Sequence, residues 1–391
     1  MTTRRRQTTM ALAAVLIAAT GGCQTKDPWA VARPSRTGGQ PAAPAPSAAP
    51  GFTLVASGDV LPHGTIIERA KADAKGSGYD FRPMLAGVKP VVARADLAIC
   101  HLETVYGADG DYTGNPTFSS PPQVAEALAA TGYDACSTAA NHTLDEGVAG
   151  IRTTLDALDR AGVRHVGSAR TADEANGVTM MRAGSAKVAH LAYTNGTNGS
   201  PLPQGQAWAV NLIDPDRIVA DARAARAAGA DVVVVSLHWG TAWQDAPDAQ
   251  QVWLSTQLTA SATNGRPDVD LILGTHAHVP QPYQKVNGTW VVYGLGDQIA
   301  DAMVDHQGVQ DPRGNESTIG RFAFAPPSHP GGRWEVTKAE FIPQFFDPGS
   351  GRVVNLNAGL DQGAAAGGVR DRIRDLVLSR GAAQDGLVMG K

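Results

Sequence analysis

Short apolar runs alternate with segments of helical periodicity along most of the chain. Apolar runs bounded by glycine or polar clusters are typical of buried strands, and apolar positions repeated every three to four residues are typical of amphipathic helices. Strands are predicted over residues 52–56, 96–100, 134–138, 164–166, 231–237, 269–273 and 290–293, and a hairpin over 178–183 and 187–193. Helices are predicted over residues 66–74, 88–93, 123–131, 148–161, 215–228 and 248–262. This alternation favours an α/β fold in which helices join neighbouring strands through right-handed crossovers.

The strands predicted at 269–273 and 290–293 both lead into polar groups. A hairpin-like turn, Asn287-Gly288, lies between them, and the first run leads through Gly274 into His276-Ala277-His278. On an extended backbone the two imidazoles point to one side, because alternate residues of a strand share a face. The second run ends in the loop 294–297. Polar groups just beyond strand ends are where open α/β sheets build their sites.

The C-terminal part is expected to belong to the same domain. A polar loop (301–318) is followed by strand-like runs near 319–324 and 334–342 and by a helix near 369–379. We expect residues 301–391 to complete the domain formed by residues 51–300, and the chain length allows a single large domain.

The N-terminus is typical of an export signal. Three arginines, Arg4 to Arg6, precede an apolar run at 10–19, and small residues lead to Cys23. This order of a basic region, a short apolar region and small residues predicts a signal peptide over residues 1–23. The cysteine resembles that of a bacterial lipoprotein lipobox, which implies a lipidated Cys23, although Thr20 stands where leucine is usual. The Sec and twin-arginine routes both stay open.

A tether is predicted over residues 24–50, which are rich in Pro, Ala, Ser and Gly and lack periodicity. Such a segment buries too little apolar surface to fold. Lipid anchor and tether together predict a domain held at the outer face of the cytoplasmic membrane.

Charge and cysteine content narrow the possible partners. The net charge is -4, 18% of the residues are charged, and no basic block or stripe suggests nucleic acid as a partner. Besides Cys23 the chain has Cys100 and Cys136, both in predicted strands. We expect two buried thiols, and a disulfide is the alternative in an oxidising compartment.

Polar residues suited to metal binding follow five of the predicted strands. Taken singly, Asp59 could cap a helix, Glu103 could be solvated, and His238 could be a core histidine. Together, at one expected sheet edge, they predict a metal site. Carboxylate, amide oxygen and imidazole suit one or two ions of Mn, Fe or Zn, whereas calcium prefers oxygen alone. The candidate ligands are Asp59, Glu103, Asn141, His238, His276 and His278.

These residues resemble the motifs of the CapA family of capsule or poly-γ-glutamate synthesis proteins, which share the calcineurin-like metallophosphoesterase fold. The resemblance spans about residues 52–300 and implies a four-layered α/β sandwich of the metallo-dependent phosphatase type. By position it assigns the six candidates as metal ligands, with Glu103 in place of the bridging aspartate. It also implies that His142 contacts the scissile group or protonates the leaving group, and that Asp145 orients His142. The matching segments are 58–59, 102–103, 140–142, 145–147, 238–240, 274–279, Gln281 and 293–297.

The chain departs from the family pattern at three places. Leu61 stands where metallophosphoesterases usually have a histidine ligand, and His63 is the nearby candidate to replace it. His101 stands where the family has Asn, and this replacement either adds His101 as a candidate ligand or is neutral. Asp297-Gln298 replaces the usual Asn-Phe. The missing histidine puts the number of bound metal ions in question.

The function implied is that of a cell-surface protein of poly-γ-glutamate or capsule biosynthesis with a metal-dependent hydrolase-like site. The bond cleaved stays open between a phosphoester and a γ-glutamyl amide. The alternatives are a non-catalytic, membrane-tethered accessory for polymer binding or export, and a secreted metallophosphodiesterase. The expected partners are an anionic polymer such as poly-γ-glutamate or a phosphoester substrate, the membrane through the lipid anchor, and membrane synthase or export proteins.

Overall fold

The computed structural model describes residues 50–108, 110–305, 307–329, 331–361 and 367–391. The predicted signal peptide and all of the predicted tether except Pro50 lie outside these residues. Within the described ranges, no helix combines the length and the apolar character needed to cross a membrane.

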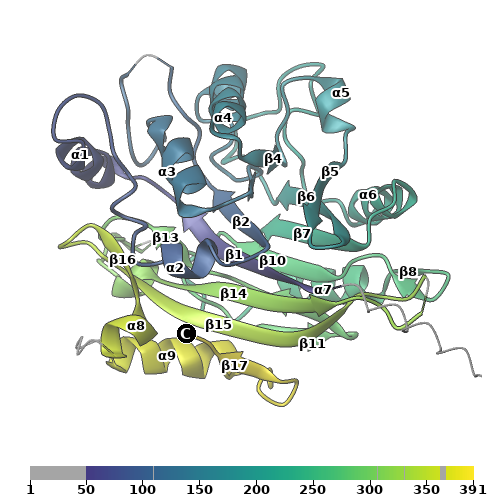
Figure 1. Cartoon of the computed structure of the whole chain (residues 1–391). Helices are drawn as coiled ribbons and strands as arrows, with labels where there is room; N and C mark the ends of the chain where they lie inside the picture. The colour runs from purple at the N-terminus through teal and green to yellow at the C-terminus, as the bar shows by residue number, and fades with distance from the viewer. Residues whose placement is uncertain (1–49, 109, 306, 330, 362–366) are drawn as a thin grey trace, which may run out of the picture. The chain divides into compact units, whose positions relative to one another are not determined.

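A nine-stranded sheet forms one half of the fold, with β1 at its centre (Figure 1). β1 pairs in parallel with β2 and β13 and antiparallel with β14, so strands from both ends of the chain meet in this sheet. Its path is β16-β15-β14-β1-β2-β3-β4, with β13 on β1 and β17 on β15. The strands are β1 (Phe52–Val60), β2 (Leu97–Leu102), β3 (Ala135–Ser137), β4 (Arg164–Val166), β13 (Asp297–Ile299), β14 (Glu316–Ala325), β15 (Glu335–Asp347), β16 (Arg352–Asn355) and β17 (Leu387–Met389).

A six-stranded sheet in the order β11-β12-β10-β7-β6-β5 forms the other half. β7 is fully buried and rich in valine, as expected for a central parallel strand. The strands are β5 (Thr179–Ala183), β6 (Ala186–Thr194), β7 (Val232–His238), β10 (Leu271–Thr275), β11 (Tyr283–Val286) and β12 (Thr289–Val292). A separate two-stranded sheet consists of β8 (Ala262–Thr263) and β9 (Arg266–Pro267).

The role expected for Asn287-Gly288 is wrong in one respect. The turn joins β11 to β12 as an antiparallel hairpin, whereas β10 and β12 run parallel. Both residues of this turn have positive φ, a conformation that Asn and Gly adopt most readily. β11 was not predicted, because its Gln284 and Lys285 interrupt the apolar pattern.

Helices cover the outer faces of both sheets. One apolar core lies between the nine-stranded sheet and α1 to α4, a second lies between the two sheets, and a third lies between the six-stranded sheet and α6 and α7. This arrangement confirms the predicted four-layered α/β sandwich. The helices are α1 (Gly64–Asp73), α2 (Lys89–Val92), α3 (Gln123–Thr131), α4 (Gly147–Ala161), α6 (Pro215–Ala227) and α7 (Ala249–Ala260), with the short elements α5 (Ala172–Ala175) and η1 (Pro312–Asn315).

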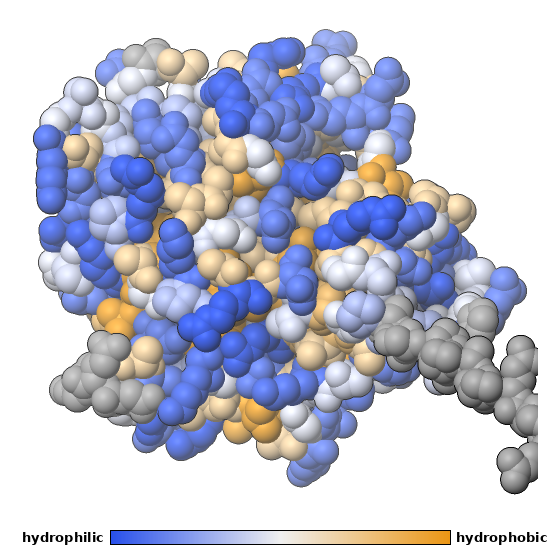
Figure 2. Space-filling view, viewed as in Figure 1, coloured by the Kyte–Doolittle hydropathy of each residue, from blue (hydrophilic) through white to orange (hydrophobic). Residues whose placement is uncertain are grey.

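The C-terminal helices α8 (Leu356–Asp361) and α9 (Gly367–Leu378) pack against β15, below the nine-stranded sheet in Figure 1. Ile373 and Val377 of α9 join the core between the two sheets. On the face seen in Figure 2, apolar residues are scattered among hydrophilic ones rather than gathered in one large patch.

Cys100 and Cys136 form a disulfide, contrary to the expectation of two buried thiols. The two residues are direct partners in the parallel register of β2 and β3, with Cα atoms 4.4 Å apart. Side chains opposite each other in neighbouring strands point to the same face. The strand register, which the sequence does not reveal, therefore creates the pairing.

Candidate metal centre

Two carboxylates lie side by side where β1 meets β13. Asp59 and Asp297 are partners in the parallel register of these strands, and the N–H of Asp59 donates to Gly296 O at 3.0 Å. The strands approach so closely at Gly58 that a Cβ atom there would lie 1.7 Å from Gly296 O. Only glycine fits this position, so the residue before Asp59 is dictated by the approach that brings the two carboxylates together.

Two neighbouring strands of the six-stranded sheet bring the histidines. His238 ends β7, and its register partner is Thr275, the last residue of β10. His276 and His278 follow in a bend with φ values of 88° and 60°. The prediction that they lie on an extended backbone is therefore wrong. Non-glycine residues rarely adopt positive φ, and such conformations gather at functional sites.

One group of ligand atoms surrounds the ring of His238. Its Nε2 atom lies 2.9 Å from Asn141 Oδ1, 3.1 Å from His276 Nδ1 and 3.8 Å from Glu103 Oε1. The other nitrogen, Nδ1, lies 3.0 Å from Thr275 Oγ1. The hydroxyl of Thr275 thus holds the ring so that Nε2 faces the centre.

A second group of ligand atoms contains three carboxylates, and it has Glu103 in common with the group around His238. Asp59, Glu103, His278 and Asp297 each offer one ligand atom, and these atoms lie within 4.8 Å of one another. Nδ1 of His278 lies 3.2 Å from both carboxylate oxygens of Asp297. The backbone N–H of His276 donates to Asp59 Oδ2 at 3.0 Å and links the two groups.

His101 also belongs to the centre. Its ring stacks on that of His238 with centroids 4.7 Å apart, and its Nε2 lies 3.5 Å from Asp59 Oδ1. Its Nδ1 lies 2.7 Å from Ser137 Oγ, which fixes the ring orientation. His101, Asp59 and His238 form a third group with ligand atoms within 4.8 Å of one another.

The buried polar atoms of this centre fit a divalent cation. Within the described part of the chain, Asp59 Oδ1, His101 Nε2 and both oxygens of Glu103 are buried without a hydrogen-bond partner. Buried polar groups in proteins are nearly always satisfied, so such a cluster requires a missing partner. Carboxylate and imidazole donors suit Mn, Fe or Zn.

The pKa shifts agree with this fit. Burial, followed by repulsion from Glu103 and Asp297, raises the pKa of Asp59, and burial also raises the pKa values of Glu103 and Asp297. A bound cation would favour their charged forms. Burial lowers the pKa of His101 to about 3 and the pKa of His238 well below its usual value, which keeps both rings in the neutral form that binds metal.

His278 behaves differently from the other histidines. Burial alone would lower its pKa, but Asp297, Glu103 and Asp59 raise the pKa to about 10. The protonated ring thus partly replaces the positive charge that the three carboxylates demand. A metal ion would take over this role.

His142 and Asp145 lie beside the centre, in the turn before α4. His142 Nδ1 is 2.7 Å from Asp145 Oδ2, and the ring packs edge-on against Phe118 with centroids 4.7 Å apart. His142 and His278 line a pocket of about 460 Å³. Asp145 and His142 are thus in direct contact, and the orienting role of Asp145 stays a prediction.

His63 lies in the wall of this pocket rather than among the close groups of ligand atoms. Its Nδ1 is 3.0 Å from Leu61 O, and its ring lies edge-on to Phe118. Burial lowers its pKa to about 4. The histidine nearest to Asp59 on the neighbouring strand β2 is instead His101, whose Nε2 lies 3.5 Å from Asp59 Oδ1.

Sequence reasoning missed Asp297 as a member of the centre. The sequence pattern marks Asp297 only as a departure from Asn, although it lies in the loop that follows the strand predicted over residues 290–293. The pocket residues Phe118, Trp243 and Met303 were also missed, because their loops carry no periodic signal. Trp243 has a φ of 68°, and its N–H donates to Ala277 O between the two histidines of the bend.

Residues 53–302 match the family model described as "Bacterial capsule synthesis protein PGA_cap". A probable polyglutamine synthesis accessory protein of Mycobacterium tuberculosis is 28% identical over 221 residues, which cover 53% of this chain and 56% of the relative. The capsule biosynthesis protein CapA of Bacillus anthracis is 23% identical over 190 residues, which cover 48% of this chain and 45% of the relative. The chain thus spans about half the length of the curated relatives it matches.

Two solved structures are similar to the chain at low sequence identity. A phosphatase of Mycoplasma pneumoniae has a TM-score of 0.46 and 15% identity, with 75% of this chain and 93% of that chain covered. The calcineurin-like phosphoesterase YfkN of Bacillus subtilis has a TM-score of 0.41 and 15% identity, with 76% and 91% covered.

Proposed function

Because the chain belongs to the bacterial capsule synthesis protein family PGA_cap, we propose that it acts in the synthesis of poly-γ-glutamate or a similar capsule polymer at the cell surface. Relatives with names for polyglutamine synthesis and capsule biosynthesis support this role. The proposal includes export through the signal at 1–23, lipidation of Cys23, and a position at the outer face of the cytoplasmic membrane. It also includes membrane synthase or export proteins as partners.

The centre would act as a metal-dependent hydrolase site. The observation that carries this proposal is the convergence of buried, unpartnered ligand atoms from Asp59, His101 and Glu103. Bound divalent ions would supply Lewis-acid charge that polarises the scissile bond and stabilises the developing negative charge. The residues that would hold them are Asp59, His101, Glu103, Asn141, His238, His276, His278 and Asp297.

His142 is suited to proton transfer at this site. When Nδ1 of His142 carries a proton and donates a hydrogen bond to Asp145, the other nitrogen, Nε2, can exchange a proton with a substrate in the pocket. The N–H of Phe118 donates to the same oxygen of Asp145 at 2.7 Å and holds the carboxylate in place. The carboxylate can therefore fix this tautomer and the orientation of the ring. His142 would thus protonate the leaving group.

The side chains that line the pocket beside the centre distinguish a phosphomonoester from a phosphodiester substrate. Its described lining contains Asp301 but neither Lys nor Arg, together with the apolar side chains of Leu61, Phe118, Trp243 and Met303. A phosphomonoester dianion would therefore meet a carboxylate without an arginine clamp. Among phosphoesters, this lining therefore supports a singly charged phosphodiester as the substrate. The γ-glutamyl amide of the anionic polymer is the other candidate bond.

A metal assay tests the centre directly. Elemental analysis of the purified protein after incubation with Mn, Fe or Zn should give about one to two equivalents, and Asp59→Asn and Glu103→Gln should lose most of this metal. Asp216→Asn, which alters an exposed carboxylate in α6, is the matched control. Less than about a tenth of an equivalent in the wild-type protein would refute a tight metal site.

A substrate assay tests the chemistry. Release of nitroaniline from γ-glutamyl-p-nitroanilide, or of nitrophenol from bis-p-nitrophenyl phosphate, should depend on the metal that the protein retains. Activity on the amide alone assigns the bond as a γ-glutamyl amide, and activity on the diester alone assigns a phosphodiesterase. Full metal loading without turnover of either probe contradicts the hydrolase proposal.

The alternative role is a non-catalytic accessory for polymer binding or export. The word "accessory" in the name of the mycobacterial relatives favours it. A deletion strain complemented with variants separates the two roles, because only catalysis needs the proton transfer. Polymer output that survives His142→Ala but not Asp59→Ala favours binding without turnover, and equal loss in both favours catalysis.

A further inference from the structure

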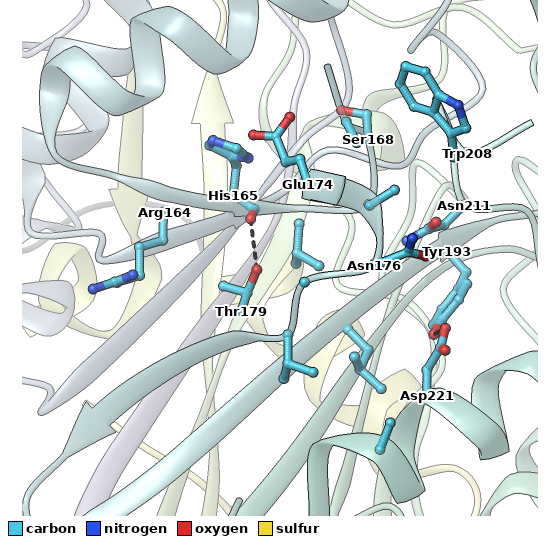
Figure 3. A pocket seen from close by; sticks show the side chains of 18 of the residues that line it. Arg164, His165, Ser168, Glu174, Asn176, Thr179, Tyr193, Trp208, Asn211 and Asp221 are labelled. Atoms are coloured by element: carbon cyan, nitrogen blue, oxygen red, sulfur yellow. Dashed lines mark hydrogen bonds between the residues drawn. The ribbon is translucent and has the colours of Figure 1, made fainter. Parts of the chain in front are cut away.

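A second and larger cavity lies apart from the metal centre. It measures about 760 Å³, within the range of about 300–1,000 Å³ typical of small-molecule sites, and it shares no lining residue with the pocket beside the centre. It is formed where β4, an end strand of the nine-stranded sheet, meets β5 and β6 of the six-stranded sheet, with α5 and α6 at its sides. Figure 3 shows the side chains that line it.

The cavity has rigid apolar surfaces. Leu191 and Tyr193 of β6 and Met180 of β5 present apolar atoms to it, and Tyr193 is buried. Trp208 is half-buried and packs against the core that lies under α1 to α4. Its indole is therefore held in place by the fold and still reaches the cavity, which is what a stacking platform requires.

Planar polar side chains surround these surfaces. Tyr193 Oη donates to Asp221 Oδ2 at 2.7 Å, and Arg217 donates to Asn211 Oδ1 at 2.8 Å. In Figure 3, Trp208, Asn211, Tyr193 and Asp221 follow one side of the cavity, and Asn176 lies nearer to its middle. Each carboxylate and amide keeps lone pairs or N–H groups beyond these contacts, so each can still bind a ligand.

The charges in the cavity largely cancel. Glu174 and Asp159 both pair with Arg170 behind the wall, with atoms 2.5 Å and 2.8 Å apart. Asp221 lies 3.4 Å from Arg217. Arg164 also lines the cavity, so the three acidic side chains are balanced by three basic ones, Arg164, Arg170 and Arg217. A charged ligand would disturb this balance, whereas a neutral ligand with many hydroxyl groups would only add hydrogen bonds.

We propose that this cavity binds a neutral saccharide of about two or three sugar units. The C–H face of a sugar packs on an aromatic ring, here Trp208, and neighbouring hydroxyl groups bind planar carboxylate and amide groups such as Asp221 and Asn176. The site is independent of the proposed metal chemistry. It would attach the domain to a glycan while the metal centre faces its own substrate.

Ligand-observed NMR with chitotriose and maltotriose tests this proposal on the full chain. Saturation transfer from protein to sugar protons should be seen for at least one of the two, and calorimetry should give a Kd at or below about 1 mM. Trp208→Ala and Asp221→Asn should weaken binding at least about tenfold, which corresponds to about 1.4 kcal/mol.

Matched controls separate this site from other surfaces. Trp253→Ala removes a tryptophan on α7 that is 53% exposed and outside the cavity, and it should leave binding unchanged. Glu103→Gln, which alters the metal centre, should also leave it unchanged. Asn176→Ala changes a cavity side chain at the end of α5 and serves if Trp208→Ala does not fold.

Three outcomes overturn the proposal. The first is that neither trisaccharide binds at a concentration of about 10 mM, ten times the expected upper limit of the Kd. The second is binding that Trp208→Ala, or Asn176→Ala in its place, leaves intact. The third is a preference for an anionic probe, tested with a γ-glutamate trimer, that the same substitutions abolish.

Discussion

Nδ1 of His142 lies 2.7 Å from Oδ2 of Asp145, and that oxygen also accepts the N–H of Phe118 at 2.7 Å. One carboxylate thus fixes both the imidazole and the loop that packs edge-on against it. Neither residue is in the groups of ligand atoms, and His142 lines the pocket beside them. This separation allows the proton-transfer role to be tested without disturbing the proposed metal ligands.

Asp145→Asn should lower kcat for the hydrolysed substrate by about 10–100-fold, because the amide no longer fixes the tautomer and orientation of His142. Metal content should stay at the wild-type level. Steady-state kinetics together with elemental analysis measures both. A variant with unchanged kcat assigns the pair a purely structural role, and Asp216→Asn is the control for loss of a carboxylate.

Glu103→Gln should stabilise the metal-free protein by about 1–3 kcal/mol at pH 7, because it removes a buried, unpartnered negative charge that Asp297 repels. The raised pKa of Glu103 sets the sign. The protonated carboxyl of Glu103 is the form that the fold favours. The stability that it contributes is complete below the unfolded-state pKa of Glu103 and is lost as pH rises through the folded-state pKa. Urea denaturation of chelator-treated protein at pH 5 and pH 7 should show a gain in the variant that grows with pH.

The same variant should lose the stabilisation that added Mn or Zn gives to the wild-type protein. Glu126→Gln, an exposed change in α3, controls for the substitution itself. Equal metal stabilisation of both variants contradicts a role for Glu103 in metal binding.

His190→Gln should make the protein less sensitive to acid. His190 is fully buried on β6, its Nε2 lies 2.8 Å from Ser236 Oγ, and burial lowers its pKa to about 3. Because the folded-state pKa is depressed, its contribution is present above the unfolded-state pKa of about 6.5 and is lost as pH falls toward 3. The loss approaches about 1.4 kcal/mol per pH unit in this window.

Urea denaturation between pH 7 and pH 4 measures this effect as a difference in slope between wild type and His190→Gln. Other buried histidines contribute equally to both proteins, so the difference isolates His190. Parallel pH profiles of the two proteins contradict the assignment.

Gly58→Ala should prevent folding or cost about 4 kcal/mol or more, because its Cβ would overlap Gly296 O at the junction of β1 and β13. Gly64→Ala is a matched control at the first residue of α1, where an added Cβ meets no atom within 4 Å. It should be neutral or stabilise by about 0.4–1 kcal/mol. Thermal unfolding of both variants tests the pair, and similar effects at the two positions rule out the close approach.

Replacing Cys100 and Cys136 by serine should cost about 2–5 kcal/mol, since the disulfide closes a loop with a sequence separation of 36 residues. Denaturation under oxidising and reducing conditions measures the contribution in the wild-type protein. A wild-type protein that titrates with two free thiols after oxidative purification would contradict the disulfide.

Local patterns predicted the elements that depend on local forces. α3 covers the predicted residues 123–131, and α4 begins one residue before its prediction and ends at Gly162 in the left-handed conformation. In contrast, β1 continues to Val60, four residues past the predicted end. Ser57 and Gly58 carry no strand signal, and their conformation depends on pairing with β2 and β13 from elsewhere in the chain.

The candidate site was predictable where residues follow a strand directly. Glu103 follows β2 of the nine-stranded sheet, whereas His238 and His276 lie at the ends of β7 and β10 of the six-stranded sheet. These residues gather as expected, but the expectation of a single sheet edge is wrong, because the C-terminal strand ends of two sheets meet at the centre. Asp297 was not predicted as a member, because its place depends on the register of β13 against Asp59. The positive φ values of His276 and His278 likewise follow from a bend that the apolar pattern does not encode.

The pairing of β1 with β14 also determines when the domain can fold during synthesis. β1 is complete once Val60 has left the ribosome, but its antiparallel neighbour begins only at Glu316, beyond the end of the family match at residue 302. Until then one edge of β1 in the nascent chain has open hydrogen-bonding groups, a state prone to aggregation. A fragment that stops at residue 302 keeps this open edge permanently, so the smallest autonomous folding unit extends beyond the segment that matches the family into the C-terminal strands.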